Sequence, residues 1–270
     1  MSELPFVATA PVWVSKVGLK ARDAENLAKY YESVVGLVEL ERRAETIVLG
    51  AGGRELLEIE AAPAARPDDP RSAGLFHTAF LLPARADLAR WAGHAVANRL
   101  AIDGASDHLV SEAMYLTDPE GNGIEIYADR QPDQWKRSGS SIEMATLPLD
   151  MAGLLATLEG DSADWQRAPD NTIVGHVHLR VGDTKQAKRW WNEEMGLETM
   201  VRYGGQAVFL ATGGYHHHIG ANSWRSAGAG RRDTDRAGLA YVELHSARSA
   251  SAQVRHDPWG TEIRTVPANG

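Results

Sequence analysis

The 270-residue sequence predicts an α+β protein built from four βαβββ modules arranged in two pairs. An internal repeat with an offset of 160 residues, alternating apolar segments around each copy, and glycine turn signals between short strands predict this class. The composition, 43% apolar and 24% charged, fits one large globular domain or two of ordinary size. It excludes disordered, collagen-like and coiled-coil proteins.

The repeat is clearest in two predicted helices. Residues 23–37 read DAENLAKYYESVVGL, and residues 183–197 read DTKQAKRWWNEEMGL. Each segment begins with an aspartate that can cap a helix and ends with Gly-Leu, where glycine favours helix termination. The aromatic pairs at 30–31 and 190–191 have helical spacing, so one ring of each is expected to pack on a sheet.

A strand precedes each of these helices and short strands follow it. The preceding segments, KVGLKARD and HVHLRVGD, alternate as strands do. In the first copy the strand candidates that follow the helix are ETIVLG and ELLEIE, separated by Gly52-Gly53. In the second copy they are QAVFLA and YHHHIG (215–220), separated by Gly213-Gly214. Each copy is therefore predicted to be a βαβββ unit.

Two more modules share this design. One has a strand at 74–84, a helix at 87–100 and a last strand ending at Tyr127, and the other runs from Gly238 to DPWGTEIRTV with a shortened helix. The first pair is expected over 11–130, the second over 173–270, and a connector with one helix near 149–158 over 131–172. The segment RSAGAGRRDTDR, residues 225–236, is predicted to be a mobile loop.

The net charge and the amino-acid composition limit which partners and metal ligands are possible. The 28 basic and 36 acidic residues give a formal net charge of -8, which argues against nucleic acid or an anionic membrane as a partner. No apolar run approaches the roughly 20 residues of a membrane-spanning helix, and the start lacks signal-peptide features, so a cytoplasmic protein is expected. Without cysteine, any metal must be bound by carboxylates and the ten histidines.

Residues 104–127, GASDHLVSEAMYLTDPEGNGIEIY, resemble the extradiol ring-cleaving signature. The matching positions are His108, Met114-Tyr115, Asp118-Pro119, Gly121 and Glu125, and the position of Ser106 departs from the signature. With the four modules, the chain resembles the vicinal oxygen chelate superfamily of glyoxalase I, extradiol dioxygenases and bleomycin- and fosfomycin-resistance proteins, most closely its catechol-2,3-dioxygenase-like branch. The resemblance spans nearly all of the chain. It implies two open β-barrel-like domains and an Fe(II)-dependent extradiol dioxygenase that cleaves a catechol-type vicinal diol with O₂.

The repeat also selects candidate metal ligands. Each module can point one side chain inward from its first strand and one from its last. In modules two and three these positions give two imidazoles and a carboxylate, the set expected of non-haem Fe(II), with Mn(II) as the alternative: His77, His176 and Glu125. In modules one and four they give residues that rarely bind such a metal: Lys16, Tyr241 and Arg264. Pairing of the two inner modules is therefore expected, whereas pairing one with two would set Lys16 against the ligands.

Two residues of the signature are candidates for catalysis. His108 could move the proton that a diol loses, and the Tyr115 hydroxyl could hydrogen-bond a diol oxygen. The alternative is that Tyr115 simply packs and that His108 is a loop residue.

Four further histidines are candidate site residues. On a strand, His216 and His218 share one face and His217 takes the other, so one of the three could be a fourth ligand or bind substrate. The alternative is a surface cluster that binds adventitious metal. His178 lies on the same face as His176 and is the fallback ligand.

Two other functions stay open at this stage. A glyoxalase-type isomerase or lyase would use a metal without O₂ and is favoured if His216, His217 or His218 is a fourth ligand. A metal-free protein that sequesters small molecules would use an apolar groove instead. The expected partners are an aromatic diol and O₂, and self-association into a homo-oligomer is left open.

Overall fold

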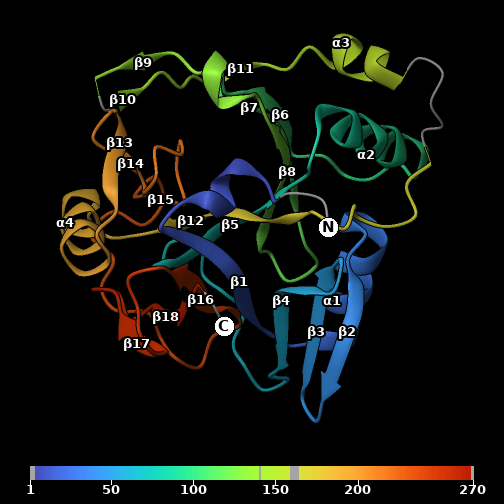
Figure 1. The fold of residues 1–270 in the computed structure, drawn as a ribbon. Coiled ribbons are helices and arrows are strands. Elements are labelled where there is room, and N and C mark those ends of the chain that lie inside the picture. Colours follow the sequence, from blue (N-terminus) through green and yellow to red (C-terminus); the bar gives the residue numbers. More distant parts are fainter. Residues whose placement is uncertain (1–3, 140, 159–163, 269–270) are drawn as a thin grey trace.

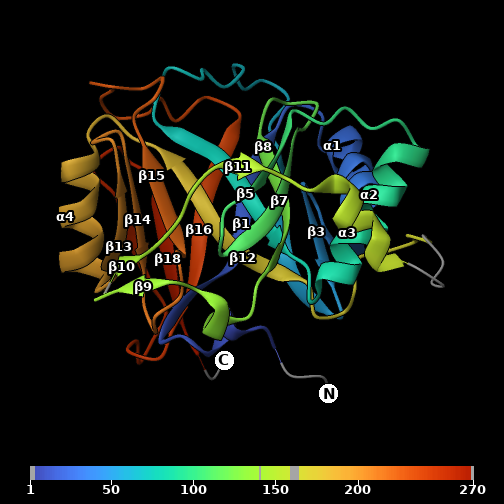
Figure 2. The same ribbon diagram turned by 90° about the horizontal axis from the view of Figure 1, so that it is seen from above.

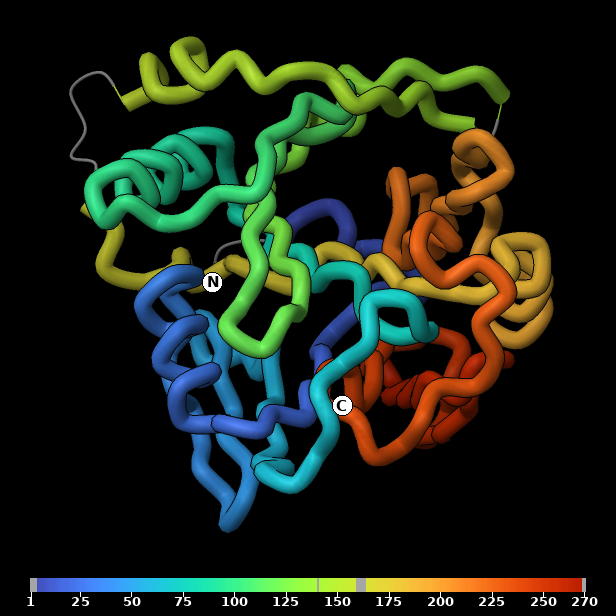
Figure 3. Tube along the Cα trace, turned by 180° about the vertical axis from the view of Figure 1, so that it is seen from behind, coloured from blue at the N-terminus to red at the C-terminus, as the bar shows by residue number. Residues whose placement is uncertain are grey.

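The fold is described from a computed structural model, over residues 4–139, 141–158 and 164–268 (Figure 1). It confirms the α+β class, because two mixed sheets carry nearly all of the strands. Figure 2 shows α1, α2 and α3 on one side of the molecule and α4 on the other. The tube in Figure 3 shows the connector crossing from the second module to the third along the edge of the molecule.

The first sheet joins strands from the two ends of the chain. Its order is β17-β18-β16-β1-β4-β3-β2. In chain order its strands are β1 (Val12–Ala21), β2 (Val38–Arg43), β3 (Thr46–Ala51), β4 (Arg54–Ala61), β16 (Gly238–Ser246), β17 (Gln253–His256) and β18 (Glu262–Pro267).

The second sheet is made by the middle of the chain. Its order is β11-β6-β7-β8-β5-β12-β15-β14-β13. In chain order its strands are β5 (Gly74–Leu81), β6 (Gly104–Asp107), β7 (Ser111–Thr117), β8 (Gly123–Asp129), β11 (Leu147–Pro148), β12 (Ile173–Arg180), β13 (Glu198–Tyr203), β14 (Ala207–Ala211) and β15 (Ile219–Asn222). A separate short hairpin pairs β9 (Arg137–Ser138) with β10 (Ser141–Ile142).

The helices follow the predicted caps. They are α1 (Ala24–Tyr30), which continues as the π-helical η2 (Tyr31–Val35), α2 (Arg85–Ala97), α3 (Met151–Leu155) and α4 (Thr184–Met195), with short 3₁₀ segments at η1 (Phe6–Thr9), η3 (Pro132–Gln134) and η4 (Ala156–Leu158). Asp23 and Asp183 accept hydrogen bonds from the first backbone N–H groups of α1 and α4. Gly36 and Gly196, with φ of +83° and +67°, end the two helical segments in the left-handed conformation. One ring of each aromatic pair is fully buried, Tyr31 and Trp191.

The sheet orders confirm that the inner modules pair. Antiparallel β5 and β12 join module two to module three, and antiparallel β1 and β16 join module one to module four. The central strands β1 and β12 also contact each other, so the two sheets meet in one core. The division of the chain at residues 130 and 172 stays a prediction, and residues 159–163 of the connector lie outside the described part.

Three details differ from the sequence-based expectation. Module four is βββ, because the six residues between β16 and β17 form no helix. The strand expected at 215–220 begins only at Ile219, because Gly213 and Gly214 both adopt positive φ and turn the chain. The loop expected to be mobile is tied to the body, since the buried Ser226 hydroxyl donates to the Val181 carbonyl.

The connector helix expected near 149–158 is present as α3 and η4. Over the described residues, no helix is both long enough and apolar enough to cross a membrane.

Candidate active site and metal centre

Three adjacent strands of the second sheet bring the predicted ligands together. Glu125 of β8 and His176 of β12 both lie opposite Ala79 of β5, and His77 is two residues before Ala79 on the same face. Ala79 is fully buried, and its small methyl group leaves room above it for the two longer side chains to converge. The register of three strands therefore places one carboxylate and two imidazoles over one point of the sheet.

The three ligand atoms form a nearly equilateral triangle. Glu125 Oε2 lies 3.0 Å from both His77 Nε2 and His176 Nε2, and the two nitrogens are 3.3 Å apart. Ligand atoms about 2.1 Å from one ion and at right angles are about 3.0 Å apart, whereas tetrahedral angles would separate them by about 3.4 Å. The two distances to Glu125 match the right-angle value and the distance between the nitrogens is slightly wider, so the three atoms are spaced to bind one common cation.

Burial and charge also fit a cation at this point. All three residues are buried, and no Lys or Arg contacts the Glu125 carboxylate among the described residues. Burial lowers the pKa of His176 to about 4 against the opposing attraction of Glu125, so its imidazole is neutral near pH 7. Burial alone would raise the pKa of Glu125, but contact with His176 and His77 holds it well below its usual range. Three electron-pair donors facing each other are stable when a proton or a metal ion lies between them.

His108 and Tyr115 form a hydrogen-bonded pair beside this centre. His108 Nδ1 donates to the Ala145 carbonyl at 2.7 Å, which leaves Nε2 to accept from the Tyr115 hydroxyl at 2.6 Å. Burial, with the nearby Glu125 carboxylate, raises the pKa of Tyr115 well above 10, so its hydroxyl keeps its proton. The Tyr115 hydroxyl is thus hydrogen-bonded to His108, and the Tyr115 ring lies 5.7 Å from the ring of His77.

The strand-based expectation for the three consecutive histidines is wrong, because residues 215–218 precede β15 and all three rings are buried. His216 Nε2 donates to Asp129 at 2.9 Å, which leaves its Nδ1 to accept a hydrogen bond from the Nδ1–H group of His217 at 2.8 Å. His217 Nε2 is therefore an acceptor. The His217 ring stacks on His176 with centroids 4.0 Å apart, and it lines the cavity.

The other two histidines have different places. His218 lies in the core and hydrogen-bonds the Val7 carbonyl, and a surface cluster is thereby excluded for this run. His178 also lines the cavity, with its ring 5.1 Å from His77, and its buried Nε2 has no partner among the described residues. It is not part of the ligand triangle.

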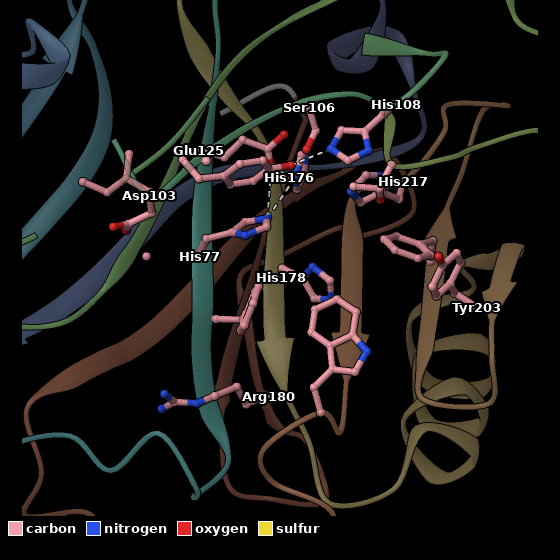
Figure 4. Close-up of a pocket in the computed structure, with 18 of the residues that line it drawn as sticks. His77, Asp103, Ser106, His108, Glu125, His176, His178, Arg180, Tyr203 and His217 are labelled. Atoms are coloured by element: carbon pink, nitrogen blue, oxygen red, sulfur yellow. Dashed lines mark hydrogen bonds and ion pairs between the residues drawn. The ribbon is translucent and has the colours of Figure 1, made fainter. Parts of the chain in front are cut away.

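The triangle opens into a cavity of about 760 Å³. Figure 4 shows His77, Glu125 and His176 at one end, with His108 and His217 beside them and Arg180 farther along β12. The volume falls in the range of roughly 300–1,000 Å³ that is typical of small-molecule sites. The cavity has both a candidate metal centre and room for an organic substrate.

This fold and this centre define a class of protein, and the chain belongs to it: the glyoxalase/bleomycin resistance protein/dioxygenase superfamily. The family model matches residues 13–126. A catechol-2,3-dioxygenase of Bacillus subtilis (strain 168) is 40% identical over 230 residues, which are 84% of this chain and 80% of that protein.

Solved structures share the fold at low sequence identity. Glyoxalase I from Zea mays superposes with a TM-score of 0.56 at 13% identity, covering 98% of this chain and 96% of that one. The cppA protein from Streptococcus pneumoniae TIGR4 superposes with a TM-score of 0.55 at 12% identity, covering 94% and 98%. These likenesses support the two-sheet, four-module architecture.

Several residues of the site were missed from the sequence. Asp129 orients His216. It lies four residues after Glu125 on β8, so strand alternation places both side chains on the same face and could have identified it. Ala79 carries no chemical signal, because its contribution is its small size. Arg180 lies on the face of β12 that carries His176 and His178, so strand alternation alone would have placed it in the cavity.

Proposed function

We propose that this protein is an extradiol dioxygenase that uses Fe(II) and O₂ to cleave the ring of a catechol-type vicinal diol. The observation that carries the proposal is the triangle of His77, His176 and Glu125, with ligand atoms 3.0–3.3 Å apart and an open side facing the cavity. Two imidazoles and one carboxylate on one face are the donor set of non-haem Fe(II) oxygenases. The identity of 40% to a catechol-2,3-dioxygenase supports the same assignment.

The metal ligands are His77, His176 and Glu125. When bound, Fe(II) supplies open coordination positions for the diol and for O₂, and Mn(II) fits the same donors. The protein keeps the His176 imidazole neutral and the Glu125 carboxylate ionised, and these are the protonation states in which the two side chains bind a divalent cation.

His217 is suited to accept the proton that the diol loses. Its Nδ1 proton is committed to His216, which is in turn held by Asp129, so Nε2 presents a lone pair toward the cavity. Stacking on His176 fixes the ring beside the metal centre.

Tyr115 is suited to position the diol, with His108 holding its hydroxyl. The Tyr115 oxygen donates its proton to His108 Nε2 and can still accept a hydrogen bond from a diol hydroxyl. His108 therefore moves a proton through Tyr115 rather than by direct contact. A fourth ligand from His216, His217 or His218 would favour the glyoxalase-type alternative, and the ligand cluster found among the described residues contains none of them.

Anaerobic reconstitution with Fe(II), followed by oxygen uptake with catechol, tests the proposal. The expected result is one O₂ consumed per diol and a yellow ring-opened product. Stoichiometric iron in the protein with no oxygen uptake for any of a panel of substituted diols would refute the proposed activity. Isomerisation of a hemithioacetal without O₂ would favour the glyoxalase-type function instead.

A further inference from the structure

The part of the cavity beyond the metal centre has a distinct chemical character. His176, His178 and Arg180 alternate along β12 and point to one face, and Figure 4 shows them in succession. All three line the cavity. At roughly 3.3 Å per residue, Arg180 begins roughly 13 Å along the strand from His176.

Aromatic side chains form the middle of this cavity. The His178 ring contacts three of them, with centroids 5.2 Å from Phe76, 5.4 Å from Trp224 and 5.6 Å from Phe209. Phe76 and Trp224 also contact each other at 5.2 Å. This section suits the carbon atoms of a ring substituent and offers few polar partners to it.

Arginine side chains lie at the end of the cavity away from the metal centre, and their positive charge exceeds the negative charge of their one carboxylate partner. Arg180 Nη2 and Arg232 Nη2 both donate to Asp68, so two guanidinium groups share one carboxylate. The side chains of all three residues are nearly buried, between 7% and 11% exposed. Arg225 also lines the cavity and forms no ion pair with the described residues.

Arg180 has donor capacity to spare. Within the part of the chain that the structure describes, Nη2 is the only nitrogen of its guanidinium that forms a hydrogen bond, and Nε is buried without a partner. Arg232 also donates to the carbonyls of Ala237 and Leu239, although its Nε is likewise buried without a partner among the described residues. A buried cation with unused donors is costly unless an acceptor binds there. This local positive charge occurs in a protein whose formal net charge is -8.

We propose that this end of the cavity binds a carboxylate on the side chain of the diol, so that the preferred substrate is a catechol with a short acidic substituent. The inference rests on the proposed function for the orientation of the ring, with the diol at the metal centre. The aromatic section then packs the substituent's carbon atoms. Arg180 pairs with the carboxylate, and Arg225 adds its charge at the cavity mouth.

A matched pair of probes tests this subsite: a catechol carrying a propionate chain and the methyl ester of the same compound. Binding of each is measured anaerobically by calorimetry to the iron-loaded protein, and kcat/KM is measured in air. The acid is expected to bind about 10- to 100-fold more tightly than the ester, the range for a charge-assisted hydrogen-bonded pair. In Arg180→Gln this preference is expected to fall below about 3-fold, and Arg180→Lys should keep part of it.

Arg71→Gln is the matched control, because Arg71 lies in the same loop as Asp68 with a side chain 83% exposed. It should retain the full preference for the acid. If Arg180→Gln does not fold, Arg225→Gln should reduce the preference several-fold, since that residue is exposed and unpaired.

The two proposals fail separately in this experiment. Equal binding of acid and ester to the native protein would overturn the carboxylate subsite, whether or not both are cleaved. Preferred binding of the acid without cleavage of either compound would uphold the subsite and overturn the dioxygenase activity.

Discussion

The two sheets have the same central arrangement but different chemistry at equivalent positions. In the second sheet β12 pairs with β5, and β8 runs parallel to β5. In the first sheet β1 pairs with β16, and β18 runs parallel to β16. The positions that hold His77, Glu125 and His176 in one sheet hold residues with side-chain cations or a phenol in the other: Tyr241, Arg264 and Lys16.

Lys16 supplies a cation in the first sheet. Its Nζ lies 2.7 Å from Glu55, 3.9 Å from Glu243 and 4.0 Å from Glu58. In the second sheet no lysine or arginine among the described residues contacts the converging donors, so the positive charge comes from a proton or from a bound cation. The same architecture thus holds a centre with its own cation, here called the self-neutralised centre, in one half and a candidate metal centre in the other.

Tyr241 fills the space in the first sheet that remains open in the second. The Arg264 guanidinium lies 3.5 Å from the centre of the Tyr241 ring, a cation–π contact. The ring lies against Gly18, where a Cβ atom would come within 2.2 Å of it.

The largest expected effect is that of Glu125→Gln. A neutral amide replaces the only anionic ligand, so iron should be lost and activity should fall by at least about 100-fold, with the fold retained. Iron content, oxygen uptake and circular dichroism measure the three quantities. The matched control is Glu243→Gln in the first sheet, which should keep its iron; native iron content in Glu125→Gln would remove that residue from the ligand set.

His217→Phe should keep the metal and lower kcat by about 100-fold, the usual contribution of a general base. His108→Phe, which acts only through Tyr115, should lower kcat by about 10-fold. Stopped-flow measurement of diol deprotonation separates the two. Equal and small losses in both variants would show that neither histidine accepts the proton.

Lys16→Met tests the self-neutralised centre. It leaves three carboxylates without their shared cation, and the free energy of unfolding should fall by about 2 kcal/mol. Iron affinity should not change, because the second sheet is intact. Denaturant unfolding and iron titration measure the two effects, and a fall in iron affinity equal to that of a ligand variant would contradict the independence of the two centres.

The last expected effect is on the pH dependence of stability in the metal-free protein. Burial lowers the pKa of His176 to about 4 and that of His218 to about 3, so between pH 6.5 and 4 the unfolded chain binds more protons at these sites. Stability should therefore fall as the pH decreases through that window, by up to about 1.4 kcal/mol per pH unit for each residue. Urea unfolding at several pH values measures the slope.

His218→Asn should flatten that slope, because one buried neutral imidazole is removed. His94, which lies on α2 with an exposed hydrogen bond to the Ser33 carbonyl, offers the control. His94→Asn should leave the slope as it is. An unchanged slope in His218→Asn would show that its imidazole does not titrate differently in the folded state.

The repeat made much of this architecture predictable. Helix caps at Asp23 and Asp183 and strand alternation around His77 and His176 are local signals, so their elements were placed correctly. The pairing of the modules was harder to predict. It could be inferred because only pairing of modules two and three brings the two imidazoles close to Glu125. The sequence therefore predicted the ligand cluster as well as the fold class.

Other features depend on tertiary contacts that no local pattern records. The strand expected at Tyr215 is absent because the chain after the Gly213-Gly214 turn stays irregular as far as His218. A pattern of alternating apolar residues cannot reveal such an irregular segment. The orientation of His217 depends on Asp129, which is distant in sequence. The shared use of Asp68 by Arg180 and Arg232 joins three separate segments in the same way.

A diffraction measurement on anaerobic crystals loaded with Fe(II) tests the central claim most directly. Anomalous scattering at the iron edge should show one ion within about 2.2 Å of His77 Nε2, His176 Nε2 and a Glu125 oxygen, with no second ion near Lys16. Iron bound elsewhere, or an empty triangle in crystals that contain excess iron, would contradict it.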